Sequence, residues 1–118
     1  MNITFENVRP IKPGYEATIR ISYGLDFWTS ENLATGRLIA QFRKEISSDV
    51  ICTVDTNDGS ITREDDAVIV ITISDEQTAL MLKTHYVRFD LIREDQGVQS
   101  PIPGMWKWPV KLTVTRDV

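Results

Sequence analysis

The stretch that decides the fold is Thr72–Glu94, which reads TISDEQTALMLKTHYVRFDLIRE. Its apolar spacing changes twice, from a β-branched run to a helical period and then to strict alternation. This predicts a strand that ends at Ile73, one or two helical turns over residues 75–83, and a second strand that begins near His85. Such a succession describes architecture and says little about chemistry.

The helical segment carries its own start signal. Ser74, or alternatively Asp75, is the expected N-cap, because its side-chain oxygen can accept a hydrogen bond from a free N–H group of the first turn. Ala79, Leu80 and Leu82 are expected to form the apolar side of the helix. Because a helix this short is unstable alone in water, it must be held by packing against the rest of the protein.

The strand after the helix alternates over its whole length. Val87, Phe89 and Leu91 fall on one face, and Arg88 and Asp90 fall on the other. A period of two is typical of a strand with one buried face. We therefore expect the apolar face to belong to the core.

Similar patterns recur along the chain. Further strands are predicted at Tyr15–Ser22, Arg37–Lys44, Val50–Val54, Ala67–Ile73 and Lys107–Thr115. The β-branched run Ala67–Ile73 is apolar enough to be buried on both faces. Short strands at this spacing with one short helical segment predict an all-β fold, an antiparallel β-sandwich of about seven strands. The length of 118 residues predicts a single domain.

Glycine and proline mark the expected connections. Residues 1–14 are predicted to form an irregular lead-in, and residues 23–36 and 94–106 to form long loops, the second of them rich in proline. Asp58-Gly59 predicts a hairpin turn. Pro109 has no backbone N–H, so the last strand is expected to lie at the edge of its sheet.

The alternation of the strands also predicts a core, because every second residue of a strand faces the same side. We expect ten residues to be largely buried: Ile19, Ile21, Leu38, Phe42, Val70, Val87, Phe89, Leu91, Val110 and Leu112.

Composition limits the classes of function. The net charge is −4 and the basic residues are scattered, which argues against a nucleic-acid partner. No apolar run approaches the roughly 18–20 residues that a membrane span needs. The single Cys52 cannot form an internal disulfide, so nothing requires an oxidising compartment. The chain is expected to be made in the cytoplasm.

The residues offer little for catalysis. His85 is the only histidine, and Cys52 falls on the inward side of its strand, where cysteine behaves as a small hydrophobe. No phosphate-binding loop, nucleophile motif or paired-histidine motif is present. We therefore expect no enzymatic activity and no cofactor.

The acidic segment Asp55–Asp58 invites a calcium interpretation. If Gly59 took the glycine position of an EF-hand loop, Val54 and Thr56 would occupy ligand positions, so the register fails. We expect a solvated turn, while a weak, irregular cation site near Asp55–Asp58 stays open as an alternative.

Aromatic residues give one further alternative. Tyr23, Asp26 and Trp28 lie in one predicted loop, and Trp106 ends another. Aromatic side chains beside a carboxylate can stack on sugar rings, so these four residues are candidates for a carbohydrate-binding module. The competing interpretation places Trp106 in the core and Trp28 as a cap on one end of the sandwich.

Two sequence blocks resemble a known family. The first is GRLIAQFR (residues 36–43), followed by VDTNDGSI (residues 54–61). The second is ISDEQTAL (residues 73–80), followed by YVRFDL (residues 86–91) and VTR (residues 114–116). These blocks resemble the small immunoglobulin-like proteins of tailed phages and prophages, and are similar to the N-terminal domain of phage baseplate upper proteins. The resemblance covers roughly residues 15–116.

The resemblance implies an immunoglobulin-like β-sandwich that acts as a virion component. It implies a tail or baseplate protein that binds other phage structural proteins, and it implies no cofactor. Whether the chain is also a homo-oligomer, and whether it is a virion part or an assembly factor, are left open. In the carbohydrate alternative, the partner would instead be a glycan.

Overall fold

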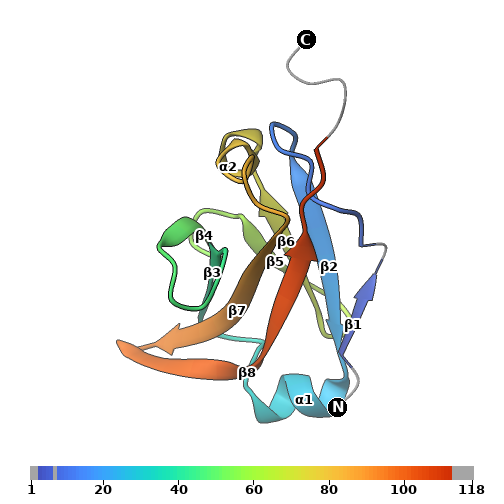
Figure 1. The fold of residues 1–118 in the computed structure, drawn as a ribbon. Coiled ribbons are helices and arrows are strands. Elements are labelled where there is room, and N and C mark those ends of the chain that lie inside the picture. The colour runs from blue at the N-terminus through green and yellow to red at the C-terminus, as the bar shows by residue number, and fades with distance from the viewer. Residues whose placement is uncertain (1–2, 7, 113–118) are drawn as a thin grey trace.

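The computed structural model describes residues 3–6 and 8–112, which form eight strands and two short helices (Figure 1). In chain order these are β1 (Ile3–Glu6), β2 (Ala17–Tyr23), α1 (Leu25–Ser30), β3 (Arg37–Arg43), β4 (Val50–Asp55), β5 (Ile61–Glu64), β6 (Val68–Ile73), α2 (Asp75–Ala79), β7 (Tyr86–Asp95) and β8 (Val98–Pro109).

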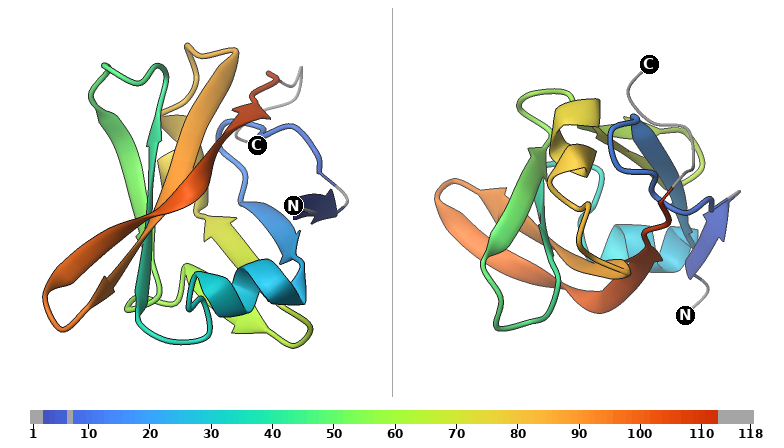
Figure 2. Two further views of the ribbon diagram at one scale, coloured as in Figure 1. Left: turned by 90° about the horizontal axis from the view of Figure 1, so that it is seen from below. Right: turned by 45° about the horizontal axis from the view of Figure 1, so that its top comes forward.

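Two antiparallel four-stranded sheets face each other. The first has the strand order β1-β2-β6-β5, and the second has the order β4-β3-β7-β8. In immunoglobulin lettering this is ABED against C′CFG. The described residues therefore confirm the predicted all-β sandwich. Helix α1 lies at one end of it and α2 at the other (Figures 1 and 2).

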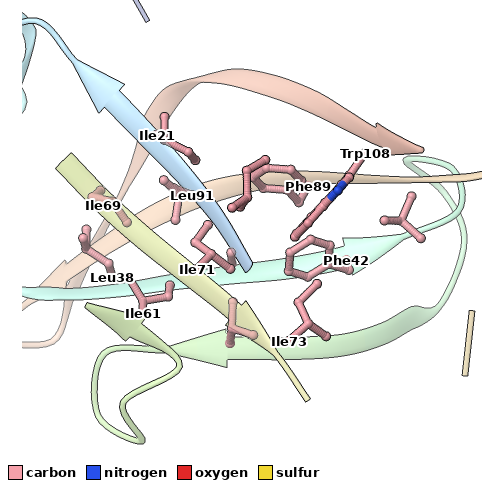
Figure 3. Close-up of a cluster of buried hydrophobic side chains, with 14 of the residues drawn as sticks. Ile21, Leu38, Phe42, Ile61, Ile69, Ile71, Ile73, Phe89, Leu91 and Trp108 are labelled. Atoms are coloured by element: carbon pink, nitrogen blue, oxygen red, sulfur yellow. The ribbon is translucent and has the colours of Figure 1, made fainter. Parts of the chain in front are cut away.

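The inward faces of both sheets form one apolar core (Figure 3). The rings of Phe42 and Phe89 stack with their centroids 4.9 Å apart, and Trp108 tilts against both. Trp108 is only 1% exposed, and its indole N–H donates to the carbonyl of Arg9 at 2.7 Å. The fully buried tryptophan therefore comes from the last described strand.

Of the ten residues expected in the core, eight are buried, and Val70 and Leu112 are not. Strand β6 alternates, with Ile69, Ile71 and Ile73 inward, so the prediction that it is buried on both faces was wrong and Val70 is half-buried. Leu112 is 51% exposed, because the last strand ends at Pro109 rather than continuing. The predicted strand residues 113–115 lie outside the described part of the chain.

Helix α2 begins as predicted. The Ser74 hydroxyl accepts a hydrogen bond from the backbone N–H of Gln77 at 3.1 Å, and the Gln77 side chain accepts one from the Ser74 N–H at 3.0 Å. This reciprocal pair is a capping box. The expected apolar side was wrong, however. The helix ends at Ala79, which is exposed, as are Leu80 (65%) and Leu82 (45%). The buried side chains are Thr78 in the helix and Met81 just after it.

Two elements were not expected. Strand β1 pairs with β2 in the register Ile3↔Tyr23, so the predicted irregular lead-in contains a strand. Helix α1 occupies part of the predicted loop over residues 23–36, where Phe27 and Trp28 pack on the core. Neither element is long enough to show a clear period in the sequence.

The predicted loop over residues 94–106 is a β-hairpin. Asp95 pairs with Val98, and both residues of the two-residue turn, Gln96 and Gly97, have positive φ angles of 52° and 81°. These angles are typical of a type I′ hairpin turn. Prolines are tolerated in β8 because it is an edge strand, as Pro109 predicted.

The turn predicted at Asp58-Gly59 exists but does not close a hairpin. Gly59 has a φ of +83°, yet β4 before it belongs to the second sheet and β5 after it to the first. The segment between them therefore crosses from one sheet to the other. Local sequence indicates a turn, but it does not indicate which strands the turn connects.

Candidate functional site

The four residues considered for sugar binding do not form one exposed platform. Tyr23 is fully buried, and its ring stacks on Phe27 with 5.4 Å between centroids and 7° between planes. The ring of Trp28 is half-buried, with its centroid 6.4 Å from that of Tyr23. Tyr23 is therefore part of the core, and the prediction of an exposed binding residue there was wrong.

Asp26 and Trp106 lie in different surroundings. Asp26 is exposed on α1, and the described residues give it no ion pair. Trp106 is half-buried on β8, with its ring centroid 5.7 Å from that of Phe5 on β1 and 5.6 Å from that of Phe89. Trp106 thus closes the side of the sandwich between the edge strands β8 and β1. Trp28 belongs to α1 and packs against the core at that end of the sandwich, as the competing interpretation proposed.

The acidic segment after β4 is occupied by protein contacts. The Arg37 guanidinium donates to both carboxylate oxygens of Asp55, and the backbone N–H of Asn57 donates to the same carboxylate at 2.7 Å. The hydrogen bonds from Arg37 hold the pKa of Asp55 below its usual value. Asp58 accepts hydrogen bonds from Ser60. These carboxylates therefore fix the segment between the two sheets.

Other candidate residues are also separated. His85 is exposed just before β7, and Cys52 is buried in β4, where burial raises the pKa of its thiol to about 11. Among residues 3–6 and 8–112, no three His, Cys, Asp or Glu side chains are grouped closely enough to hold a metal ion. Within the same residues, no helix is long and apolar enough to cross a membrane.

A charged cluster that sequence reasoning missed lies on the outer face of the second sheet. The Tyr86 hydroxyl donates to Glu45, and Lys107 Nζ lies 4.6 Å from the centre of the Tyr86 ring. Arg88 forms an ion pair with Glu45 at 3.3 Å. The hydrogen bond from Tyr86, with the positive charges of Arg88 and Lys107, lowers the pKa of Glu45. Strand alternation indicates that Tyr86 and Arg88 face outward, but not that Glu45 joins them.

Two exposed apolar side chains flank a small hollow beside this cluster. Ile46, in the connection between β3 and β4, is 68% exposed, and Met105 on β8 is 47% exposed. They line a hollow of about 100 Å³ together with Phe89 and Arg88. The hollow lies where β8 bulges, since Phe89 pairs with Trp106 whereas Leu91 pairs with Ile102. A bulge of this kind redirects side chains, and here it brings Met105 to the surface.

The exposed edges of the second sheet are only partly available for strand addition. Strand β8 carries Pro101, Pro103 and Pro109, none of which can donate a backbone hydrogen bond to an added strand. Strand β4 has its Thr53 carbonyl covered by the Gln77 side chain, which donates to it at 3.2 Å. Faces and ends of the sandwich are therefore better suited to contacts than these two edges.

No protein-family model matches this chain, and no curated protein matches it in sequence.

Proposed function

We propose that this chain is a non-enzymatic structural or adaptor protein of a phage or prophage virion, associated with its tail or baseplate. It would be made in the host cytoplasm and would act through contacts with other structural proteins. The starting point is the resemblance of residues 15–116 to small immunoglobulin-like tail proteins. The fold that this resemblance implies agrees with the two-sheet sandwich of the described residues.

The observation that carries the proposal is the exposed apolar surface beside the hollow on the second sheet. Ile46 and Met105 expose large apolar side chains next to the half-buried Arg88. Apolar side chains surrounded by charged groups are common in protein–protein contact sites. A hollow of about 100 Å³ has room for one side chain of a partner protein.

The residues that carry the resemblance have framework roles. Ser74 caps α2, Asp55 pairs with Arg37 across β3 and β4, and Phe89 packs in the core. A family resemblance that rests on such residues concerns the fold and not a catalytic site. It therefore supports a binding protein more than an enzyme. The carbohydrate alternative receives less support, because Tyr23 is fully buried.

The proposal is tested by capturing tail and baseplate proteins from a phage lysate with the tagged chain. Ile46→Asp and Met105→Asp together should reduce capture of the cognate partner at least about tenfold, the effect expected when central apolar contacts are lost. Because both side chains are exposed, these changes should leave the fold intact, which circular dichroism checks.

Two control variants accompany this experiment. His85→Ala combined with Cys52→Ala should leave partner capture unchanged, apart from a modest stability cost at Cys52. Val98→Asp changes an equally exposed apolar residue, 65% exposed at the hairpin end, and tests whether a new charge alone disturbs binding. If His85→Ala abolishes function in a stable protein, the non-enzymatic proposal is wrong.

A further inference from the structure

The charges of this protein are distributed unevenly between its two ends. Most charges along the sheets are paired, as in Arg20 with Glu64, Arg37 with Asp55, and Arg88 with Glu45. Such pairs cancel one another at a distance. The charged groups that lie outside these pairs therefore determine how one copy of the protein attracts another.

The end that carries α1 is acidic. Asp26 and Glu31 lie in α1 and just after it, and Asp65 and Asp66 form the turn between β5 and β6. A hydrogen bond from the Tyr23 N–H to the Ala67 carbonyl, 2.9 Å long, holds this turn beside the start of α1. The described residues give none of these four carboxylates an ion pair. Arg63 on β5 also reaches this end, where it donates to the carbonyls of Leu33 and Gly36, so the four carboxylates are accompanied by one positive charge that forms no ion pair with another described residue.

This acidic end also exposes an apolar side chain. Leu25, the first residue of α1, is 71% exposed, the most exposed large apolar residue among those that the structure describes. It stands next to Asp26. The end therefore combines a protruding apolar group with negative charge, which suits a partner surface that is apolar and basic.

The segment before β2 and the end of β8 lie toward the end of the sandwich opposite α1 (Figure 1). Hydrogen bonds from the Ile11 N–H to Pro109 and from the Lys111 N–H to Ile11, each 2.8 Å, place the segment of Arg9 and Lys12 beside the end of β8. A third bond, from the Val110 N–H to the His85 carbonyl, brings the turn after α2 to the same place.

We define the basic surface at this end as Arg9, Lys12, Lys83 and Lys111. All four side chains are exposed, and none forms an ion pair with another described residue. Leu82 and Leu112, 45% and 51% exposed, adjoin it in the chain.

Exposed acidic residues also lie at this end, namely Glu16, Asp58, Asp75 and Glu76. Glu16 borders the hollow lined by Arg9 and Lys12, whereas Asp58 and Glu76 line a second hollow that shares only Glu16 with the first.

We infer that copies of this chain associate head to tail, with the acidic α1 end of one copy against the basic surface of the next. The inference rests on the proposed function as a structural protein and names a second copy as one of its partners. A contact between two different surfaces is heterologous, and it produces a ring if the rotation closes and a filament if it does not. Opposite charge brings the ends together, while Leu25 can pack near Leu82 and Leu112.

Sedimentation velocity of the native chain at two ionic strengths tests this first. At about 0.01 M salt the Debye length is about 30 Å, and at about 1 M it is about 3 Å. The dissociation constant of self-association should therefore rise at least about tenfold from the lower to the higher salt concentration. A native chain that stays monomeric at low salt over the full accessible concentration range overturns the inference.

Charge-reversal variants then identify the surfaces. Asp26→Lys with Asp65→Lys removes the acidic end, and Lys83→Glu with Lys111→Glu removes the basic one. Each variant alone should be monomeric, whereas an equimolar mixture should assemble again, because the two native ends still match and the two reversed ends also carry opposite charges. If a single variant still assembles, or if the mixture does not, the ends do not bind each other and the inference is wrong.

The matched control is Asp49→Lys with Asp90→Lys, which changes the charge equally on two exposed residues, one in the connection between β3 and β4 and one on β7. This variant should assemble like the native chain, and loss of assembly would show that total charge matters rather than the ends.

Capture of tail proteins separates the two proposals. A chain that binds tail proteins but never itself refutes only head-to-tail assembly, and one that assembles without binding any tail protein refutes the proposed function.

Discussion

At the scale of single residues, Tyr23 combines full burial with an unsatisfied hydroxyl. Its oxygen is buried and makes no hydrogen bond with the described residues, and burial raises the pKa of the phenol. A buried polar group without a partner costs about 1–3 kcal/mol of folding free energy. Its ring stacks on Phe27, and this apolar contact offsets part of the cost without giving the hydroxyl a hydrogen-bond partner.

Tyr23→Phe should therefore leave stability unchanged or raise the free energy of unfolding by up to about 1 kcal/mol, because it removes the hydroxyl and keeps the ring. Urea denaturation measures the change. Tyr86→Phe is the matched control, since its hydroxyl donates to Glu45, and it should be slightly destabilising. A loss above about 1 kcal/mol for Tyr23→Phe would mean that the hydroxyl has a stabilising partner.

Phe89 tests most directly which face of β7 is buried in the core. It is 2% exposed and contacts the rings of Phe42, Trp106 and Trp108. Phe89→Ala should lower the free energy of unfolding by about 3–5 kcal/mol, the cost of removing a buried ring and leaving a cavity. Leu112→Ala, at an exposed position, should change it by less than about 0.5 kcal/mol. A small effect at Phe89 in the same denaturation experiment would contradict the assignment of the inward face of β7.

At the scale of elements, two arginines from different sheets hold the connection between α1 and β3. Arg63 on β5 donates to the carbonyls of Leu33 and Gly36, each at 2.6 Å. Arg93 on β7 donates to the carbonyls of Asn32 and Thr35, each at 2.9 Å. These hydrogen bonds attach the irregular connection to both sheets.

The turn between β5 and β6 contains local strain. Asp66 and Ala67 have φ angles of 64° and 62°, in the left-handed region that costs a residue with a Cβ roughly 1–2 kcal/mol. Ala67→Gly removes this cost but adds about 0.5–1 kcal/mol of backbone entropy. Ala67 is also buried, so the change removes a packed methyl group worth about 0.8 kcal/mol. We therefore expect the unfolding free energy to change by less than about 0.5 kcal/mol.

Ala40→Gly is the control for that substitution. Ala40 is 1% exposed in the regular strand β3, where glycine weakens the strand and removes a packed methyl group, so this change should destabilise by about 1 kcal/mol or more. Both variants are compared by thermal unfolding. If Ala67→Gly destabilises as much as Ala40→Gly, the turn is not strained.

At the scale of the whole molecule, acid should lower stability by weakening contacts within the second sheet and its β3–β4 connection. The pKa values of Asp55 and Glu45 are both lowered in the folded state, by the hydrogen bonds from Arg37 and from Tyr86 respectively. A carboxylate with a lowered folded pKa contributes stability that is complete above its unfolded pKa of about 4 and is lost as the pH falls through the folded value.

Unfolding free energy should thus be steady from neutral pH to about pH 5 and should decrease below about pH 4. Asp55→Asn removes the better buried of the two carboxylates, so the variant should be less stable at neutral pH and should lose less stability in acid. Denaturant titration at several pH values measures both. Equal acid sensitivity in the native chain and in Asp55→Asn would exclude Asp55 as a source of the effect.

The sequence by itself determined the features that depend on neighbouring residues. Alternation identified the inward face of β7, since successive side chains of a strand point to opposite sides wherever the strand lies. The capping box of α2 was predictable because Ser74 and Gln77 are three residues apart. Pro109 placed the last strand at an edge because the missing N–H is a property of proline alone.

Tertiary structure alone decided which distant segments meet. The turn at Gly59 links two sheets because β5 pairs with β6, which no local signal indicates. Arg93 and Thr35 are 58 residues apart in sequence, yet the guanidinium donates to that carbonyl. The acidic and basic ends likewise arise only on folding, when residues far apart in the chain are packed together. Such contacts depend on the simultaneous packing of both sheets, and a period of two or 3.6 residues carries no information about them.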